Sequence, residues 1–373
     1  MRPLTTDDSL TPPIKLGFSY NGGRRHPTEH YLSDAFGSEY AIHYDLQSAH
    51  ADVSVIDLLE KSRGSGNVPE AFAQVIDTPP LPSDLHRCTV PTVCLDIDSF
   101  GWTSSRIRWA MLFDYVFVWH PSLLSAYKSA GHPKVFMVPQ AVDATLYDMT
   151  PIVESRSLDV GWVGAFDYGH YTKRRRIIER LAAQFNMNNV MHRYSKDEIA
   201  QIYKESKIVV NVSREDFPQD ANLRCYEAMA AGALLITELP SELTEWGFRE
   251  GEHFVGWHNE GEISSLVDYY LRNDQERIKI AHAGREITLA DFTFQKCRDT
   301  MSAILRERPA EFFAPARNWP AGRVGLLYLE HHYRHQRFEP ALKQFCALGN
   351  LAGYWKGLPM ILKTTRHWLK ALT

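Results

Sequence analysis

An arginine and a glutamate lie one helical turn apart in the stretch that is best suited to chemistry. Arg224 and Glu227 fall in a predicted helix, Leu223–Ala231, behind a polar loop. A guanidinium group binds phosphate or carboxylate through two parallel hydrogen bonds, and a helix start adds free N–H groups. A carboxylate one turn further on can accept both hydroxyls of a diol. The alternative is a solvated surface ion pair, which is a common arrangement.

The elements around this pair form a strand–loop–helix–strand unit. The run Ile208–Val212 predicts a buried strand, Ser213–Asn222 a polar loop, and Ala233–Ile236 a second strand after the helix. Gly232 suits the end of the helix, since glycine readily adopts the left-handed conformation needed there. Such units build parallel α/β sheets, which bind ligands beyond the carboxyl ends of their strands. We therefore expect the loop and the start of the helix to lie at a binding edge.

The sequence Asn222–Thr237, NLRCYEAMAAGALLIT, resembles the donor-site signature of group 1 glycosyltransferases. It is most similar to the spore-maturation-type (CgeB-like) branch, with its pattern N-x-R-x-F-E-A-x-A-x-G-A-x-L-x-T. The resemblance implies an α/β chain of the GT-B fold, in which two Rossmann-like domains face each other across a cleft. It also implies a nucleotide-diphosphate sugar as donor substrate, no cofactor, no metal, and retention of the anomeric configuration. It covers residues 155–305 well and residues 14–150 in outline.

The resemblance also implies roles for individual residues. Glu227 would hold the donor ribose, and the diphosphate would be bound by Gly164, Lys173, Arg174, Asn222 and Arg224. A solvated basic face is the alternative for Lys173 and Arg174. Many members carry a second glutamate eight positions before the ribose-binding one; here that residue is Gln219, next to Asp220. We expect both to lie at the reacting sugar, and this departure leaves the stereochemical outcome open.

Two further sites are expected in the N-terminal half. His120 follows the predicted strand Tyr115–Trp119, so it could contact a sugar hydroxyl or act as a base at the sheet edge. The alternative is a histidine that caps the next helix or binds a core carbonyl. Gly22 and Gly23 follow the predicted strand Ile14–Tyr20, where backbone can approach an acceptor closely. A tight turn explains them equally well.

Composition limits the classes of function. A net charge of −4 gives no indication of a nucleic-acid partner. Five cysteines without a CxxC motif predict reduced thiols in a cytosolic protein. The polar N-terminus has no apolar signal core, and no run is long enough to span a membrane, which predicts a cytoplasmic protein. The pair Asp96 and Asp98 could bind a cation, but caps or solvated turns are the usual role of such acids.

The predicted organisation has three parts. Residues 1–150 form an acceptor domain, in which Val53–Leu58 predicts a strand, and residues 151–305 form the donor domain. Residues 306–373 form a helical extension that packs on the catalytic body. Its end, residues 354–373, is basic and apolar, which suits peripheral contact with the inner membrane face. The alternative is a helix docked on the protein.

These features predict a hexosyltransferase-type enzyme that moves a sugar to an unidentified hydroxyl acceptor, either a glycan, a lipid-linked molecule or a protein. Two alternatives remain open. One is a non-catalytic GT-B protein that binds a nucleotide or glycan, and the other is a nucleotide-sugar epimerase, which would need no acceptor.

Overall fold

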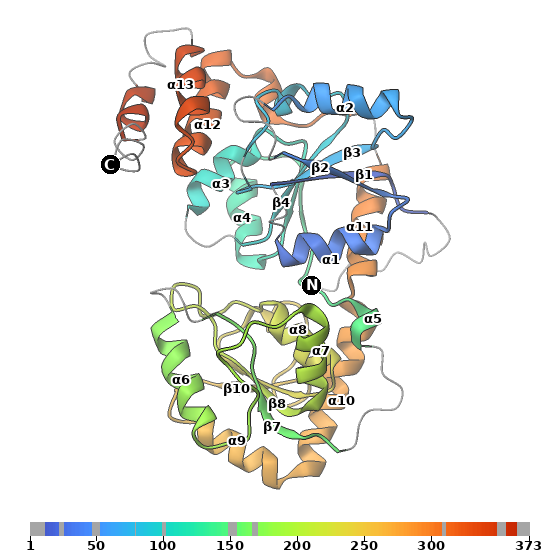
Figure 1. Ribbon diagram of the computed structural model, residues 1–373, viewed down its shortest axis with the longest axis vertical. Coiled ribbons are helices and arrows are strands. Elements are labelled where there is room, and N and C mark those ends of the chain that lie inside the picture. The colour runs from blue at the N-terminus through green and yellow to red at the C-terminus, as the bar shows by residue number, and fades with distance from the viewer. Residues whose placement is uncertain are drawn as a thin grey trace. The chain divides into compact units, whose positions relative to one another are not determined.

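The computed structural model divides into two compact units (Figure 1). The first unit combines Asp8–Val138 with Met301–Thr373, and the second unit spans Pro139–Thr300. The described residues are 12–21, 26–46, 53–78, 80–98, 102–147, 155–165, 171–307, 311–348 and 356–363. The boundary thus falls at Val138, before the position expected from the sequence, and the helical extension belongs to the first unit.

The first unit contains a six-stranded parallel sheet with the strand order β2-β1-β3-β4-β5-β6. Its strands are β1 (Leu16–Tyr20), β2 (Ala41–Asp45), β3 (Ala71–Val75), β4 (Thr92–Asp96), β5 (Tyr115–Val118) and β6 (Val135–Met137). Its main helices are α1 (Pro27–Phe36), α2 (Val55–Gly64), α3 (Thr103–Ala110), α4 (Pro121–Ser129), α12 (Ala321–Arg334) and α13 (Phe338–Cys346). The central strands β3, β4 and β5 are buried along their whole length, as expected for a parallel sheet covered on both faces.

The strand predicted at Val53–Leu58 is wrong, because this segment opens α2. Ser54 caps the helix and accepts a hydrogen bond from Asp57 N at 3.0 Å. Asp84 accepts the Val55 N–H at 2.7 Å and the Ser54 hydroxyl at 2.6 Å. A capping residue and a distant carboxylate therefore override the strand preference of the valines and isoleucine.

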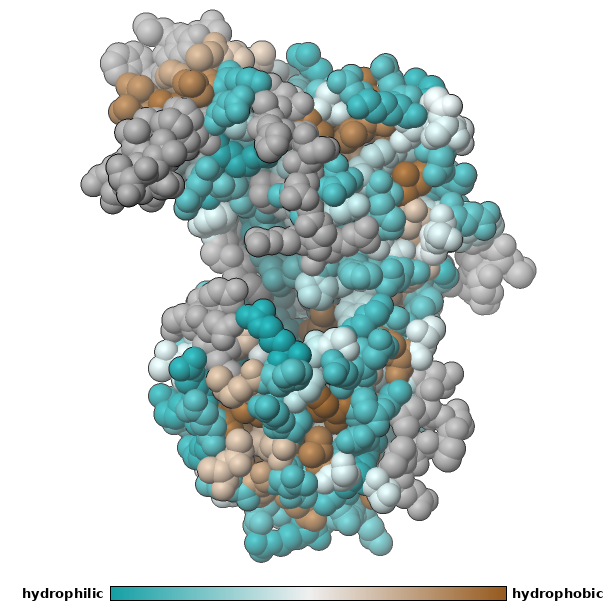
Figure 2. Space-filling view, in the orientation of Figure 1, coloured by the Kyte–Doolittle hydropathy of each residue, from teal (hydrophilic) through white to brown (hydrophobic). Residues whose placement is uncertain are grey.

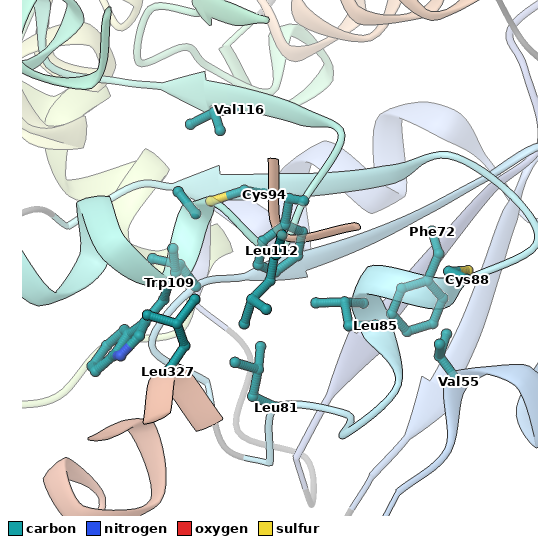
Figure 3. Close-up of a cluster of buried hydrophobic side chains, with 14 of the residues drawn as sticks. Val55, Phe72, Leu81, Leu85, Cys88, Cys94, Trp109, Leu112, Val116 and Leu327 are labelled. Carbon is teal, nitrogen blue, oxygen red and sulfur yellow. The ribbon is translucent and has the colours of Figure 1, made fainter. Parts of the chain in front are cut away.

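The C-terminal segment is part of the first unit's core. Figure 3 shows Leu327 of α12 pointing into the cluster that also holds Trp109 and Leu112. Asp114, fully buried, accepts hydrogen bonds from Phe313 N at 2.7 Å and Ala314 N at 2.9 Å. The C-terminal segment therefore contributes both apolar side chains and backbone hydrogen bonds to the core of the first unit.

The second unit contains a four-stranded parallel sheet with the order β10-β9-β8-β7. Its strands are β7 (Leu158–Gly161), β8 (Ser206–Asn211), β9 (Leu234–Glu238) and β10 (Val255–Trp257). Its helices are α5 (Ala144–Tyr147), α6 (Thr172–Ala182), α7 (Lys196–Glu205), α8 (Leu223–Ala230), α9 (Ile263–Arg272) and α10 (Asp274–Asp291), and α11 (Phe294–Arg306) leads back into the first unit. Both units are Rossmann-like, which confirms the predicted α/β class.

The last described helical residues, 356–363, dock on α12 and α13. Ile361 is buried against Leu329, Ala341 and Leu348. Figure 2 shows hydrophobic colour on the surface of this region, where Leu362 is 60% exposed. Throughout the described ranges, no helix has both the length and the apolar character needed to cross a membrane.

Candidate functional site

The second unit places the predicted signature at the carboxyl edge of its sheet. Helix α8 starts after Asn222, whose side chain caps it by accepting a hydrogen bond from Arg224 N at 3.2 Å. The residues from Arg224 to Ala230 are all buried. Small side chains at 228, 230 and 231 let the helix lie close to the sheet, so its functional groups have fixed positions.

The Arg224 guanidinium group is buried and held by neutral acceptors. Its Nε and Nη2 donate to the Val163 carbonyl at 3.0 and 2.8 Å, and Nη1 donates to Asn211 Oδ1 at 2.7 Å. The group also lies 5.2 Å from the centre of the Trp162 ring. These bonds orient the arginine without neutralising its charge.

Arg174 is a second buried guanidinium group at the same edge. Its Nε donates to the Val212 carbonyl at 2.9 Å and its Nη1 to Ala165 O at 3.3 Å. Burial, together with the positive charge of Arg224, lowers the pKa of Arg174 to about 10. Two arginines that repel each other in a buried setting are stabilised by an anion, so this edge is suited to a diphosphate.

Glu227 lies one turn beyond Arg224 and is 8% exposed. Burial raises the pKa of Glu227 to about 7, against the opposing effects of Arg224 and a hydrogen bond with Tyr147. The carboxyl group is therefore partly protonated at neutral pH. A ligand that donates hydrogen bonds would favour its ionised form.

Gly164 makes the position of Arg224 possible. A Cβ atom at this residue would lie 2.6 Å from Arg224 Nη2 and 2.7 Å from the Trp162 ring. Any larger side chain would displace the guanidinium group. The glycine predicted from the sequence thus has a steric role beside the arginine.

Lys173 is placed differently from the two arginines. Its Nζ forms a 2.5 Å salt bridge with Oε1 of Glu238, the last residue of β9. Glu238 is 9% exposed, and its Oε2 has no hydrogen-bond partner among the described residues. Of the two basic residues predicted at the diphosphate, Arg174 is the one that lies beside Arg224.

Two buried carboxylates lie close together beside this site. Oxygen atoms of Asp220 and Glu242 are within 4.8 Å of each other, and the side chains are 5% and 2% exposed. The Gln219 carbonyl accepts the Glu242 N–H at 2.9 Å, which holds the two loops together. The side chain of Gln219 is partly buried.

In the first unit, His120 lies buried between the carboxyl end of β5 and the start of α4. Its side chain makes no capping hydrogen bond to that helix. Although desolvation acts the other way, a hydrogen bond from His26 and the charges of His26 and His120 lower the pKa of Asp98. His120 and Asp98 therefore lie near each other at this edge. The other two residues predicted at the acceptor, Gly22 and Gly23, fall outside the described residues.

Asp96 has a structural role in the first unit. Its Oδ1 accepts a hydrogen bond from Arg106 Nη1 at 2.9 Å, and its Oδ2 accepts one from Tyr127 Oη at 2.6 Å. Both carboxylate oxygens are thus used within the protein. This supports the reading of the Asp96 and Asp98 pair as structural acids.

Comparisons with known proteins bear on the fold and on the family of the second unit. Residues 158–303 match the family model described as glycosyl transferase-like. HepE from Anabaena, solved in complex with UDP, superposes with a TM-score of 0.57 at 12% identity, over 79% of this chain and 100% of that one. The chain has the GT-B fold, and its second unit is similar to the glycosyl transferase-like family.

Other structures and sequences define how far the similarity extends. A glycosyltransferase from Rickettsia africae has a TM-score of 0.58 at 11% identity, over 79% of this chain and 99% of that one. Sucrose-phosphate synthase from Thermosynechococcus elongatus gives 0.55 at 12% identity, over 78% and 98%. No curated protein sequence matches the chain. The structural likeness at this identity shows the fold.

Sequence reasoning missed Glu238 and Glu242, which lie beside the predicted site residues Lys173 and Asp220. Glu238 is the last residue of buried strand β9 and Glu242 follows the strand, so their position at the carboxyl end of a parallel strand was the available signal. The run LITELPSEL contains two glutamates four residues apart. Their proximity to Lys173 and Asp220 depends on loops that only the folded chain brings together.

Proposed function

We propose that the protein transfers a sugar from a nucleotide-diphosphate sugar to a hydroxyl acceptor without a metal ion. The observation that carries this proposal is the buried Arg174 and Arg224 pair at the carboxyl edge of the second sheet. Two fixed positive charges stabilise a departing diphosphate as the glycosidic bond breaks, which is the role a divalent cation plays elsewhere. Glu227 would then accept the ribose hydroxyls.

The donor sugar would lie beside the carboxylates of this unit. The carboxylates of Asp220 and Glu242 would accept hydrogen bonds from sugar hydroxyls. Their negative charge would also stabilise the positive charge that develops at the reacting carbon. Gln219 lies in the same loop. We propose retention of the anomeric configuration, as in most relatives of the group 1 type.

The acceptor would bind the first unit near His120, which lies at the carboxyl edge of that sheet. HepE structures contain UDP and, in a separate crystal structure, UDP-glucose, so UDP sugars are the first donors to test. We propose that the protein belongs to the CgeB-like branch, because its signature contains the asparagine, arginine and glutamate of that pattern at positions 222, 224 and 227. Four buried cysteine thiols, those of Cys88, Cys94, Cys225 and Cys297, suit a cytoplasmic location.

Calorimetric titration with UDP, GDP, TDP and ADP, with and without magnesium, tests the donor site. One diphosphate should bind equally well in both conditions. Glu227→Ala should weaken that binding by about 1–3 kcal/mol, the scale of lost hydrogen bonds to a charged group. Arg174→Gln should weaken it by a similar amount.

Arg176→Gln is the matched control, since this arginine lies on the same helix, is 57% exposed and pairs with Glu260. Its binding should equal that of the wild type. If no nucleotide binds, or if binding requires magnesium, the proposed donor mechanism is wrong. With the selected donor, NMR of the glycoside product reports whether the anomeric configuration is retained.

A further inference from the structure

Helix α12 is fixed against α3, so that its last turn has a defined position in the first unit. Glu330 accepts hydrogen bonds from Ser105 Oγ at 2.7 Å and Arg108 Nε at 3.0 Å. Leu327 enters the core beside Trp109 (Figure 3). These contacts bring the end of α12 to the start of α3, directly after the carboxyl end of β4.

An exposed aromatic ring lies at this edge. Trp102 precedes α3, has a φ of 39° in the left-handed region, and is 44% exposed. A non-glycine residue in that region costs on the order of 1–2 kcal/mol, and such strain is concentrated at functional sites. The Arg334 guanidinium carbon lies 5.5 Å from the ring centre, and the His335 ring lies 5.5 Å away, edge to face.

Two further arginines, Arg106 and Arg337, and a second histidine, His331, lie near these side chains, and Arg106 is paired with Asp77 and Asp96. His331 and His335 have ring centres 4.4 Å apart. Burial, together with the charges of Arg106 and Arg337, lowers the pKa of His335 to about 4. In the parts of the chain that the structure describes, Arg334 makes no ion pair, and its buried Nε has no hydrogen-bond partner.

We propose that Trp102, Arg334 and His335 form a subsite for a phosphorylated sugar. The indole ring offers a flat apolar surface to the carbon face of a sugar ring. The guanidinium group, held over that ring, donates two hydrogen bonds to a phosphate, and the imidazole adds a third donor.

This site would make the C-terminal segment part of the acceptor site. It lies at the carboxyl edge of the first sheet, where parallel α/β sheets bind ligands. The acceptor role rests on the proposed function, whereas binding of a sugar phosphate does not. The ligand class is thus a sugar carrying a phosphate group.

Calorimetric titration with glucose 6-phosphate, glucose and inorganic phosphate tests the subsite. The full-length Arg224→Gln chain is used, because the Arg174 and Arg224 pair would also bind phosphate. Glucose 6-phosphate should bind at least tenfold more tightly than either glucose or phosphate. Equal affinity for glucose 6-phosphate and phosphate would overturn the role of the ring, and equal affinity for glucose would overturn the role of the cations.

Arg334→Gln in this background should reduce the affinity for glucose 6-phosphate at least tenfold. Arg323→Gln is the control: Arg323 stacks on Trp319, at 3.3 Å from the ring centre, near the other end of the same helix. It should leave the affinity unchanged. If the two variants behave alike, the site is not at Arg334.

Trp102→Asn separates loss of binding from loss of folding, because asparagine tolerates the left-handed conformation. This variant should retain phosphate binding and lose the preference for the sugar phosphate, with an unchanged far-UV circular dichroism spectrum. An unchanged preference would overturn the subsite. Absence of nucleotide binding to the wild-type chain would overturn the donor mechanism alone.

Discussion

Acid should destabilise the first unit through histidines at the end of α12. His331 and His332 are 0% and 2% exposed, and His335 is partly buried. Burial and the charges of Arg337 and the neighbouring histidine lower the pKa of His332 to about 3, and burial with Arg106 and Arg337 lowers that of His335 to about 4. In the unfolded chain, both would titrate near 6.5.

The sign follows from the protons bound in each state. Because the folded pKa values are lower, the folded state binds fewer protons, so stability is full above about pH 6.5 and falls as the pH decreases towards 3. At pH 5, His332 and His335 each remove about 2 kcal/mol, or about 4 kcal/mol together. His331 acts in the same direction. Asp77, whose pKa is raised chiefly by burial, acts in the opposite direction.

Urea unfolding at pH 7 and pH 5, in buffers without phosphate, measures the effect. With a denaturant slope of about 2–3 kcal/mol/M, the wild-type midpoint should fall by roughly 1–2 M. The double variant His332→Gln, His335→Gln should lose most of that pH dependence. Hydrogen exchange followed by mass spectrometry should show that protection in α12 is lost on acidification.

His30→Gln is the control, because the side chain of His30 is 50% exposed and belongs to the same unit. Its pH dependence should equal that of the wild type. The reasoning is refuted if the double variant is as sensitive to acid as the wild type, since other groups would then cause the loss.

Two glycines give further predictions. Gly164→Ala should weaken nucleotide diphosphate binding about tenfold or more with the fold intact, because its Cβ would meet Arg224 Nη2 at 2.6 Å; calorimetry measures this. Gly284→Ala should lower the free energy of unfolding by about 1–3 kcal/mol, because its Cβ would lie 2.4 Å from the His253 carbonyl oxygen. Urea unfolding compares it with Gly261→Ala, which has open space around it. A stabilised Gly284→Ala chain, as helix propensity alone predicts, would contradict the packing argument.

Local sequence was sufficient to predict helix α8. Asn222 caps α8 and the buried run from Arg224 follows, so the helix lies where capping and periodicity place it. The spacing of Arg224 and Glu227 then fixes their relation without any distant contact. The same reasoning predicted a strand at Val55, but the segment forms the start of a helix. Asp84, 29 residues away, accepts a hydrogen bond from the backbone N–H of Val55 there.

The partners of the predicted residues could not be derived from local pattern. Lys173 and Arg174 are adjacent in sequence, yet one binds Glu238 across 65 residues and the other lies beside Arg224. Both belong to the first turn of α6, where successive side chains point about 100° apart. Which of them faces the second arginine depends on how the helix is rotated on the sheet, and packing of its apolar side chains decides that rotation.

The same limit explains why helix α12 had no predicted role in ligand binding. Glu330 meets Ser105 across 225 residues, and this contact sets Arg334 over Trp102. Neither Arg334 nor Trp102 belongs to a recognisable sequence motif, and each residue alone is consistent with an ordinary surface position. The hypothesis of a binding site depends on the two side chains lying together. The Trp102 ring is strained and exposed at the carboxyl edge of a sheet, and the Arg334 guanidinium group above it has no carboxylate partner in the described chain. Under this proposal, the helix that packs in the core of the first unit also supplies the Trp102 subsite with positive charge.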